Sequence, residues 1–315
     1  MKRSTRRDFL KLGGLSLAGL LLASSGCSSS SSSSTTPRAA PAGPTGDQAY
    51  LSVAHGTDPI ALTKSALTAL GGMERFVRPG QQVIIKPNIC VDYYSPEYAV
   101  TTNPIVVGTL VTLCLAAGAK TVRVMDHPLA GNAQSAYAIS GIEAAVKAAG
   151  GEMEIMSSFK FLKTSIPTGK DITSWEIYQD VFNVDVLIDV PIAKQHSLAR
   201  LTLGGKNLMG LISNANLFHQ NLGRRVADLI SVVQPNLTVV DAVRILVDHG
   251  PTGGSLNDVR QTNTVIASHD VVAADSYAAT LFGLTGADIP SVKLAGDMGL
   301  GLIDLDSIKV EQINV

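Results

Sequence analysis

The chain has 315 residues, of which 45% are hydrophobic and 5% are aromatic, and its formal net charge is −1. That is enough apolar sequence to build the core of one large domain or two small ones. Residues 1–26 contain five Lys/Arg and one Asp, so the remainder has 20 basic and 25 acidic residues and a net charge of −5. Because no basic excess remains to follow a phosphate backbone, nucleic acid is excluded as an expected partner.

The N-terminus has the features of a targeting segment. The sequence STRRDFLK (4–11) carries the pair Arg6–Arg7, and an apolar stretch over 12–23 follows. That stretch is shorter than the roughly 20 residues of a membrane span. Residues 1–26 therefore resemble a twin-arginine export signal. The resemblance implies the twin-arginine export machinery as a partner and a periplasmic location; an uncleaved N-terminal anchor is the alternative.

A serine-rich segment follows the signal. Cys27 begins CSSSSSSSTTP and resembles a bacterial lipoprotein junction, in which the cysteine is acylated and the serines form a tether. Ser24 departs from that pattern, because a leucine-like residue is usual there. The alternative is a soluble periplasmic protein cleaved between Ala23 and Ala42. We predict a disordered linker over 27–47, and contact with the membrane only through a lipid anchor or an uncleaved signal.

From residue 48 on, β-rich runs alternate with helical runs, and we expect a single α/β domain over 48–315. This alternation favours a mainly parallel sheet covered by helices on both faces. A more polar patch near 159–177 is interpreted as an added β-hairpin. In chain order, strands are predicted over 50–54, 82–88, 121–126, 152–156, 184–193, 237–243 and 263–268, and helices over 59–72, 103–119, 136–151, 224–234 and 270–283.

Two cysteines lie beyond the linker, Cys90 and Cys114. Two thiols cannot hold a four-cysteine iron–sulfur cluster or an all-sulfur zinc site. In an oxidising compartment they could form a disulfide, whereas the apolar helical run around Cys114 favours a thiol packed in the core.

Chemically active side chains follow most of the predicted strands. In open parallel sheets, ligands bind outside the carboxyl ends of the strands. We therefore expect these side chains to gather on one edge, where imidazole and carboxylate groups suit a metal site or acid–base chemistry. As an alternative, the aspartates could cap helices, and no metal motif of fixed spacing is present. The side chains are Lys86, Asn88, Asp126, His127, Asp189, Lys194, His196, Asp241, His269 and Asp270.

Two glycine-rich loops accompany these strands. In LGGKNLMGL, Gly204 and Gly205 allow a turn with exposed N–H groups beside Lys206 and Asn207, which suggests an anion-binding loop. The spacing is not that of a phosphate-binding Walker loop. The sequence HGPTGG (249–254) is interpreted as a plain turn.

Five segments together resemble domain-of-unknown-function family 362: VIIKPNI, TTNPIVVGTLVTLCLAAGA, DVPIAKQHSLARLTLGGKNLMGLI, LTVVDAVRILVDHGPTGG and VIASHDVVAADSYAATLFG. The resemblance covers about 83–283, and the biochemistry of this family is unassigned. Many relatives carry a ferredoxin-like domain with two iron–sulfur clusters, which implies redox surroundings. This chain lacks those cysteines, so it would hold no cluster alone and would need a redox partner protein. The matching positions are Lys86, Asn88, Lys194, His196, Lys206, Asn207, Gly210, Asp241 and Asp275.

Two hypotheses follow. We favour an exported enzyme with a metal or an anionic cofactor or substrate at the carboxyl ends of the strands. The alternative is a membrane-tethered periplasmic protein that binds a small anionic ligand without catalysis. In the enzyme hypothesis the catalytic residues are His196, Lys194 and Asp241, the cofactor-binding residues are Lys86, Asn88, Lys206 and Asn207, and a divalent metal is held by Asp126, His196 and His219.

Overall fold

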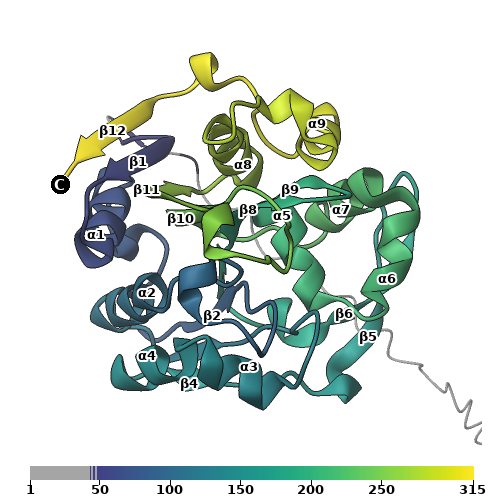
Figure 1. The fold of residues 1–315 in the computed structure, drawn as a ribbon, viewed down its shortest axis with the longest axis horizontal. Helices are drawn as coiled ribbons and strands as arrows, with labels where there is room; N and C mark the ends of the chain where they lie inside the picture. The colour runs from purple at the N-terminus through teal and green to yellow at the C-terminus, as the bar shows by residue number, and fades with distance from the viewer. Residues whose placement is uncertain (1–42, 44, 47) are drawn as a thin grey trace, which may run out of the picture. The chain divides into compact units, whose positions relative to one another are not determined.

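The computed structural model describes residue 43, residues 45–46 and residues 48–315 (Figure 1). The predicted signal, Cys27 and most of the predicted linker lie outside this range. Within it, no helix combines the length and the apolar character needed to cross a membrane. The helices are α1 (Pro59–Ala69), α2 (Pro104–Ala116), α3 (Ala133–Ile139), α4 (Ile142–Ala148), α5 (Gly204–Asn207), α6 (Ala215–Phe218), α7 (Leu222–Ile230), α8 (Val271–Thr280) and α9 (Pro290–Asp297).

The main sheet joins strands that are far apart in the sequence, in the order β12-β1-β11-β10-β7-β2-β3-β4. From β10 to β4 the neighbours on this path pair in parallel, which confirms the predicted mainly parallel α/β fold. The strands are β1 (Leu51–His55), β2 (Gln82–Pro87), β3 (Thr121–Val124), β4 (Glu152–Met153), β5 (Phe161–Ser165), β6 (Ser174–Tyr178), β7 (Val186–Val190), β8 (Ile192–His196), β9 (Arg200–Thr202), β10 (Leu237–Leu246), β11 (Val259–Ser268) and β12 (Val310–Asn314).

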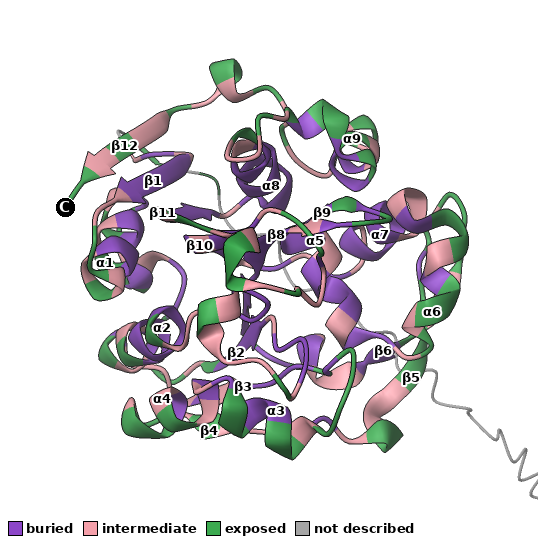
Figure 2. Cartoon of the chain, viewed as in Figure 1, coloured by how far each residue is buried: buried purple, intermediate pink, exposed green. Residues whose placement is uncertain are grey.

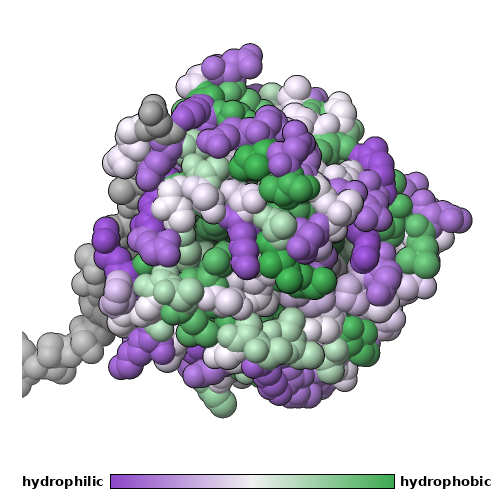
Figure 3. All heavy atoms as spheres, turned by 90° about the vertical axis from the view of Figure 1, so that its left-hand side faces the viewer, coloured by the Kyte–Doolittle hydropathy of each residue, from purple (hydrophilic) through white to green (hydrophobic). Residues whose placement is uncertain are grey.

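Helices cover both faces of this sheet. Side chains alternate between the faces of a strand, so Val83 and Ile85 of β2 enter one core while Ile84 enters the other. Helices α1, α2 and α4 pack on the first face, and α7, α8 and α9 pack on the second (Figure 1). The central strands β1, β2, β7 and β10 are buried, whereas the outer surfaces of α1, α4 and α6 are exposed (Figure 2). On the face that carries α1 and β12, hydrophilic and hydrophobic residues are interspersed (Figure 3).

The predicted hairpin is present, since β5 and β6 pair antiparallel in a small second sheet. Two other predicted elements are each divided. The helix expected over 136–151 is α3 and α4, separated at Gly141, whose φ of +71° does not fit a helix. The strand expected over 184–193 is β7 and β8, because Pro191 between them cannot donate to the ladder.

Strand β11 is antiparallel to both of its neighbours, β10 and β1. The expectation that His269 and Asp270 lie on the same edge as the other strand ends is therefore wrong. A parallel neighbour requires a crossover connection, usually a helix, and the chain between β10 and β11 contains only a loop with one short 3₁₀ turn. Asp270 instead caps α8, where its carboxylate accepts hydrogen bonds from the N–H groups of Val272 and Ala273.

Candidate functional site

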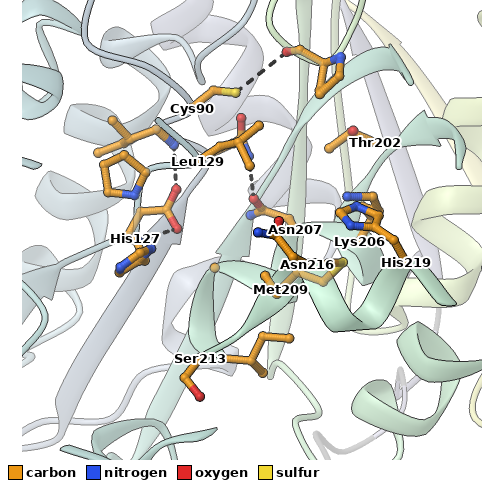
Figure 4. Close-up of a pocket in the computed structure, with 18 of the residues that line it drawn as sticks. Cys90, His127, Leu129, Thr202, Lys206, Asn207, Met209, Ser213, Asn216 and His219 are labelled. Carbon is orange, nitrogen blue, oxygen red and sulfur yellow. Dashed lines mark hydrogen bonds between the residues drawn. The ribbon is translucent and has the colours of Figure 1, made fainter. Parts of the chain in front are cut away.

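A pocket of about 830 Å³ lies beyond the carboxyl ends of β2, β3 and β8, enclosed by the segment from α5 to the turn at His219–Asn221. Figure 4 shows His127 and Leu129 on one side, Lys206 and His219 on the other, and Asn207 between them. The structure therefore brings together residues from four separate stretches of the sequence. The predicted site residues that line it are Lys86, Asn88, Asp126, Lys194, His196, Lys206, Asn207 and His219.

Lys86, at the end of β2, forms a buried ion pair. Its Nζ atom lies 2.6 Å from Asp126 Oδ1, and both side chains are at most 2% exposed. The same ammonium donates to the backbone carbonyl of Pro87 and to Asn207 Oδ1. Asp126 also accepts hydrogen bonds from the N–H groups of Ile89 and His127. All three donors of Lys86 are thus used, and its charge is balanced within the protein.

Asn207, the last residue of α5, connects most of the polar groups at the base of the pocket. Its Oδ1 atom accepts hydrogen bonds of 3.0 Å from both Lys86 Nζ and Asn88 Nδ2. Its Nδ2 atom donates to Asp189 Oδ1 at 2.8 Å and to the Lys86 carbonyl at 3.3 Å. The side-chain amide is therefore fully bonded, and its orientation is fixed by its neighbours.

Lys194, on β8, is buried beside these groups. Its Nζ atom donates to Asn88 Oδ1 at 2.9 Å and to the Val100 carbonyl at 2.7 Å. It also interacts with the Cys90 thiol. Burial lowers the pKa of Lys194 because the charged form loses its hydration. Within the described residues, no carboxylate forms an ion pair with this ammonium, so its positive charge is not balanced locally.

Lys206 lines the pocket without a partner. Across the described residues, its ammonium makes no hydrogen bond or ion pair. Burial, followed by the positive charge of Lys194, lowers the pKa of Lys206 to about 8. Lys194 and Lys206 therefore give this part of the pocket an excess of positive charge.

His196, the last residue of β8, is 5% exposed. Its Nδ1 atom accepts hydrogen bonds from the N–H groups of Leu198 at 3.0 Å and Ala199 at 3.2 Å. Burial and the nearby charge of Lys206 lower the pKa of His196 to about 3. The ring is thus neutral, and its proton lies on Nε2. This arrangement makes His196 a hydrogen-bond donor, whereas a base or a metal ligand would need a free lone pair.

The N–H groups of the Gly204–Gly205 turn are already occupied. They donate to the Asp275 carboxylate of α8 at 2.7 and 2.9 Å. The N–H groups that were predicted to bind a ligand anion therefore bind a carboxyl group of the protein itself, and both are buried. Asp189 lies next to this turn: burial raises its pKa, and its Oδ2 atom has no hydrogen-bond partner among the described residues.

Two predictions about the site do not match the structure: the placement of Asp241 in the pocket, and the metal site formed by Asp126, His196 and His219. Asp241 does not line the pocket, since its buried carboxylate accepts hydrogen bonds from the N–H groups of Asn103 and Val243. The predicted trio of metal ligands does not form a cluster. Among the described residues, the group of three that brings its ligand atoms within 4.8 Å is the surface set Asp248, His249 and Asp258.

Several pocket residues lie outside the predicted set. Cys90 and Cys114 are both free, and Cys90 lines the pocket. A sequence signal for Cys90 existed, because it follows Lys86 and Asn88 in the same loop. No such signal pointed to Leu129, Phe161 and Leu198, which border the cavity. Pro251 also lines it, so the loop over 249–254 forms part of the site as well as a turn.

A family model described as "Domain of unknown function (DUF362)" matches residues 83–280, which include every pocket residue described above. The chain belongs to this family. A curated relative is the thylakoid-associated protein sll1697 of Synechocystis sp., which is 27% identical over 255 residues, covering 76% of this chain and 75% of that protein. The name of that protein specifies no reaction, and the family is one of unknown function.

Two solved structures resemble this DUF362 chain more distantly. One is the lactate racemase apoprotein of Thermoanaerobacterium thermosaccharolyticum, with 12% identity, a TM-score of 0.46, and coverage of 69% of this chain and 53% of that one. The other is a Thermotoga maritima protein, with 11% identity and a TM-score of 0.40. The match covers 73% of this chain and 60% of that one. The DUF362 chain thus spans little more than half the length of these proteins.

Proposed function

We propose that the chain is an exported enzyme that binds a carboxylate or phosphate group of its substrate or cofactor at Lys194, His196 and Lys206. One observation carries the proposal: Lys194 and Lys206 face one pocket without a carboxylate partner among the described residues, whereas Lys86 in the same pocket is paired. Burying an unbalanced charge is costly, and a bound anion would balance it. The Nε2–H group of His196 supplies a neutral donor in the same pocket.

Catalysis, in addition to binding, is supported by Lys206. A general acid or base works best when its pKa is near the working pH. The pKa of Lys206, about 8, meets that condition, and its amine has no competing partner among the described residues. Lys206 would exchange a proton with the bound substrate, while Lys194 and His196 hold the anionic group.

Export is proposed from the sequence pattern over 1–26 and from Cys27, which supports a lipid anchor at the periplasmic face of the membrane. Any electron transfer would need a partner protein that carries the cofactor, because the chain beyond Cys27 contains only Cys90 and Cys114.

The first test measures the thermal unfolding midpoint of the purified chain with inorganic phosphate, sulfate, acetate and succinate, with and without a chelator. We expect at least one anion to raise the midpoint, since a ligand at 100 times its Kd stabilises by about 2.7 kcal/mol. Lys206→Met should abolish the rise, and Lys64→Met, on the exposed side of α1, should preserve it. Absence of a rise with every anion, or equal rises in both variants, would contradict the proposal.

The second test separates catalysis from binding. Anions that bind are incubated with the protein in D₂O and followed by NMR for covalent change or C–H exchange. The Lys206→Arg variant keeps its positive charge but cannot give up its proton. We expect it to bind the anion and to lose turnover. If no anion that binds is altered by the wild-type protein, the chain is a binding protein for an anionic solute.

A further inference from the structure

We infer that the ligand of this pocket is an amphipathic anion, with a carboxylate or phosphate head and an apolar body of several carbon atoms. The inference rests on the proposed function, because it takes the head-group site at Lys194 and Lys206 as its starting point. It adds the chemical class of the remainder of the ligand.

The outer part of the pocket is bordered by an apolar rim, formed by Leu129, Phe161 and Leu198. Leu129 is 56% exposed and Leu198 is 66% exposed. Single exposed leucines are common on protein surfaces, but these two border the same cavity. Phe161, on the hairpin strand β5, is held edge-on against Tyr178 at a centroid distance of 5.1 Å. The hairpin thus supplies a fixed aromatic side chain to the rim.

Apolar side chains continue inward from this rim. Met209 and Ile212 line the cavity and are 8% and 3% exposed. Figure 4 shows Met209 between Asn207 at the polar base and Ser213 farther along the same segment. The cavity of about 830 Å³ falls within the size range that holds ligands larger than a simple ion. A bare phosphate or acetate would leave most of this volume, and all of the apolar rim, uncovered.

The charges in the pocket favour an anionic head over a cationic one. Two carboxylates line the cavity among the described residues, Asp126 and Glu176. Asp126 is neutralised by Lys86, and the exposed Glu176 accepts a hydrogen bond from Ser213 Oγ. Glu176 forms no ion pair among the described residues, but its exposed charge is screened by water, so Lys194 and Lys206 are the unbalanced charges in the less exposed part of the pocket. A ligand that satisfies both the lysines and the rim must combine a negative head with an apolar body.

Titration calorimetry with a series of unbranched carboxylates tests this inference. The series runs from acetate through butanoate, hexanoate and octanoate to decanoate, each below its micelle concentration, and alkylammonium ions of equal length serve as the control for charge. Transfer of one CH₂ group from water predicts a gain of about two- to fourfold in affinity per methylene until the apolar rim is covered. The alkylammonium ions should not bind.

Two variants assign the chain-length effect to the apolar rim. Leu198→Ser and Phe161→Ser should flatten the dependence on chain length and leave the affinity for acetate, which does not reach the rim, unchanged. The control is Leu256→Ser, because Leu256 is 53% exposed but does not line the pocket. Lys206→Met should weaken all members of the series equally.

The outcomes separate this inference from the proposed function. If acetate binds as tightly as decanoate, the amphipathic ligand is excluded while the anion site stands. If no member binds, the inference fails, and the anion site is then decided by the unfolding midpoints with phosphate and sulfate. If Lys206→Met binds every member as tightly as the wild-type protein does, the binding does not use the head-group site and the inference fails. Affinity that rises with chain length only when the apolar rim is intact, and that Lys206→Met lowers at every chain length, would support it.

A free amphiphile and a membrane lipid both combine a negatively charged head with an apolar body. Co-sedimentation of the protein with lipid vesicles distinguishes the two sources of ligand. Phosphatidylglycerol vesicles offer an anionic head, and phosphatidylcholine vesicles are the control. Binding to phosphatidylglycerol that decanoate displaces would identify a lipid ligand. Decanoate binding without vesicle binding would identify a soluble one. If the protein binds both vesicle types and decanoate does not displace it from either, the pocket is not the binding site for vesicles. That result would overturn the assignment of a membrane lipid as the ligand.

Discussion

Gly210 packs directly against the buried ion pair that joins Lys86 to Asp126. A Cβ atom at position 210 would lie 2.1 Å from Asp126 Oδ1 and 2.7 Å from Lys86 Nζ. Neither neighbour can move easily, because the two side chains are also held by backbone groups. The absence of a side chain at Gly210 is thus a condition for the closed ion pair, which explains the glycine in the segment LGGKNLMGL.

The Gly210→Ala substitution should therefore reduce the free energy of unfolding by about 2–3 kcal/mol, the usual cost of overpacking a rigid site. Urea unfolding measures it. Gly254→Ala is the matched control, since a Cβ there would meet its nearest atom at 3.6 Å, an ordinary contact. Equal stability of the two variants would show that Lys86 and Asp126 move to accommodate the added methyl group at little cost.

Asn207 is expected to contribute to the stability of the fold, in addition to connecting the polar groups of the pocket. Asn207→Ala removes the acceptor shared by Lys86 and Asn88 and the donor to Asp189. Each buried polar group that loses its partner costs about 1–3 kcal/mol, so we expect a total loss of about 3 kcal/mol in urea unfolding. Asn216→Ala, at an exposed position of the same pocket, should change stability by less than about 0.5 kcal/mol. A small effect at both positions would contradict the network.

The sequence alone was sufficient to predict that the side chains following the parallel strands lie together at one edge of the sheet. Lys86 lies at the end of β2, Asp126 follows the neighbouring strand β3, and Lys194 lies on β8, which continues from β7. The parallel pairing of these strands brings the three side chains to one edge of the sheet. The hairpin near 159–177 was recognised by its polar composition, but its contribution to the pocket was not. Phe161 reaches the cavity through tertiary packing against Tyr178, which no local pattern encodes.

The remaining errors have identifiable physical causes. Strand direction depends on the connection, and the loop between β10 and β11 reverses the chain, which separates His269 from the site. The glycine turn at 204–205 was expected to leave its N–H groups exposed for a ligand anion, but both N–H groups are buried and donate to the Asp275 carboxyl group, about 70 residues away along the chain. Side-chain hydrogen bonding decides the role of His196, and the partners of its Nδ1 atom are backbone groups that sequence alone does not reveal.

The protonation state of His196 leads to an NMR prediction. Because burial lowers its pKa to about 3, the ring should remain neutral from pH 5 to pH 8, with the proton on Nε2. Two-bond ¹H–¹⁵N spectra of the imidazole rings distinguish the tautomers, and a His196→Gln sample assigns the signals. A ring that titrates between pH 5 and pH 8, or one protonated on Nδ1, would exclude the donor role in anion binding.

The pKa of Lys206 predicts how stability and anion binding depend on pH. In the folded protein this pKa is about 8, below the ordinary 10.5 expected in the unfolded chain. Between these values the unfolded state binds more protons, so this residue makes the ligand-free protein more stable as pH rises from 8 to 10.5. Below pH 8 the buried charge is present and costs stability. Lys206→Met should remove this pH dependence and stabilise the ligand-free protein at pH 7 by about 1–2 kcal/mol.

Anion binding should have the opposite dependence on pH, because the ammonium must be charged to attract the ligand. In the wild-type protein, the rise in the unfolding midpoint caused by the anion should be large at pH 7 and small at pH 9. Lys206→Arg remains charged at both values, so its midpoint should rise equally at each. A wild-type response that is the same at pH 7 and pH 9 would show that the Lys206 ammonium does not contact the anion, and Lys194 and His196 would then form the head-group site alone.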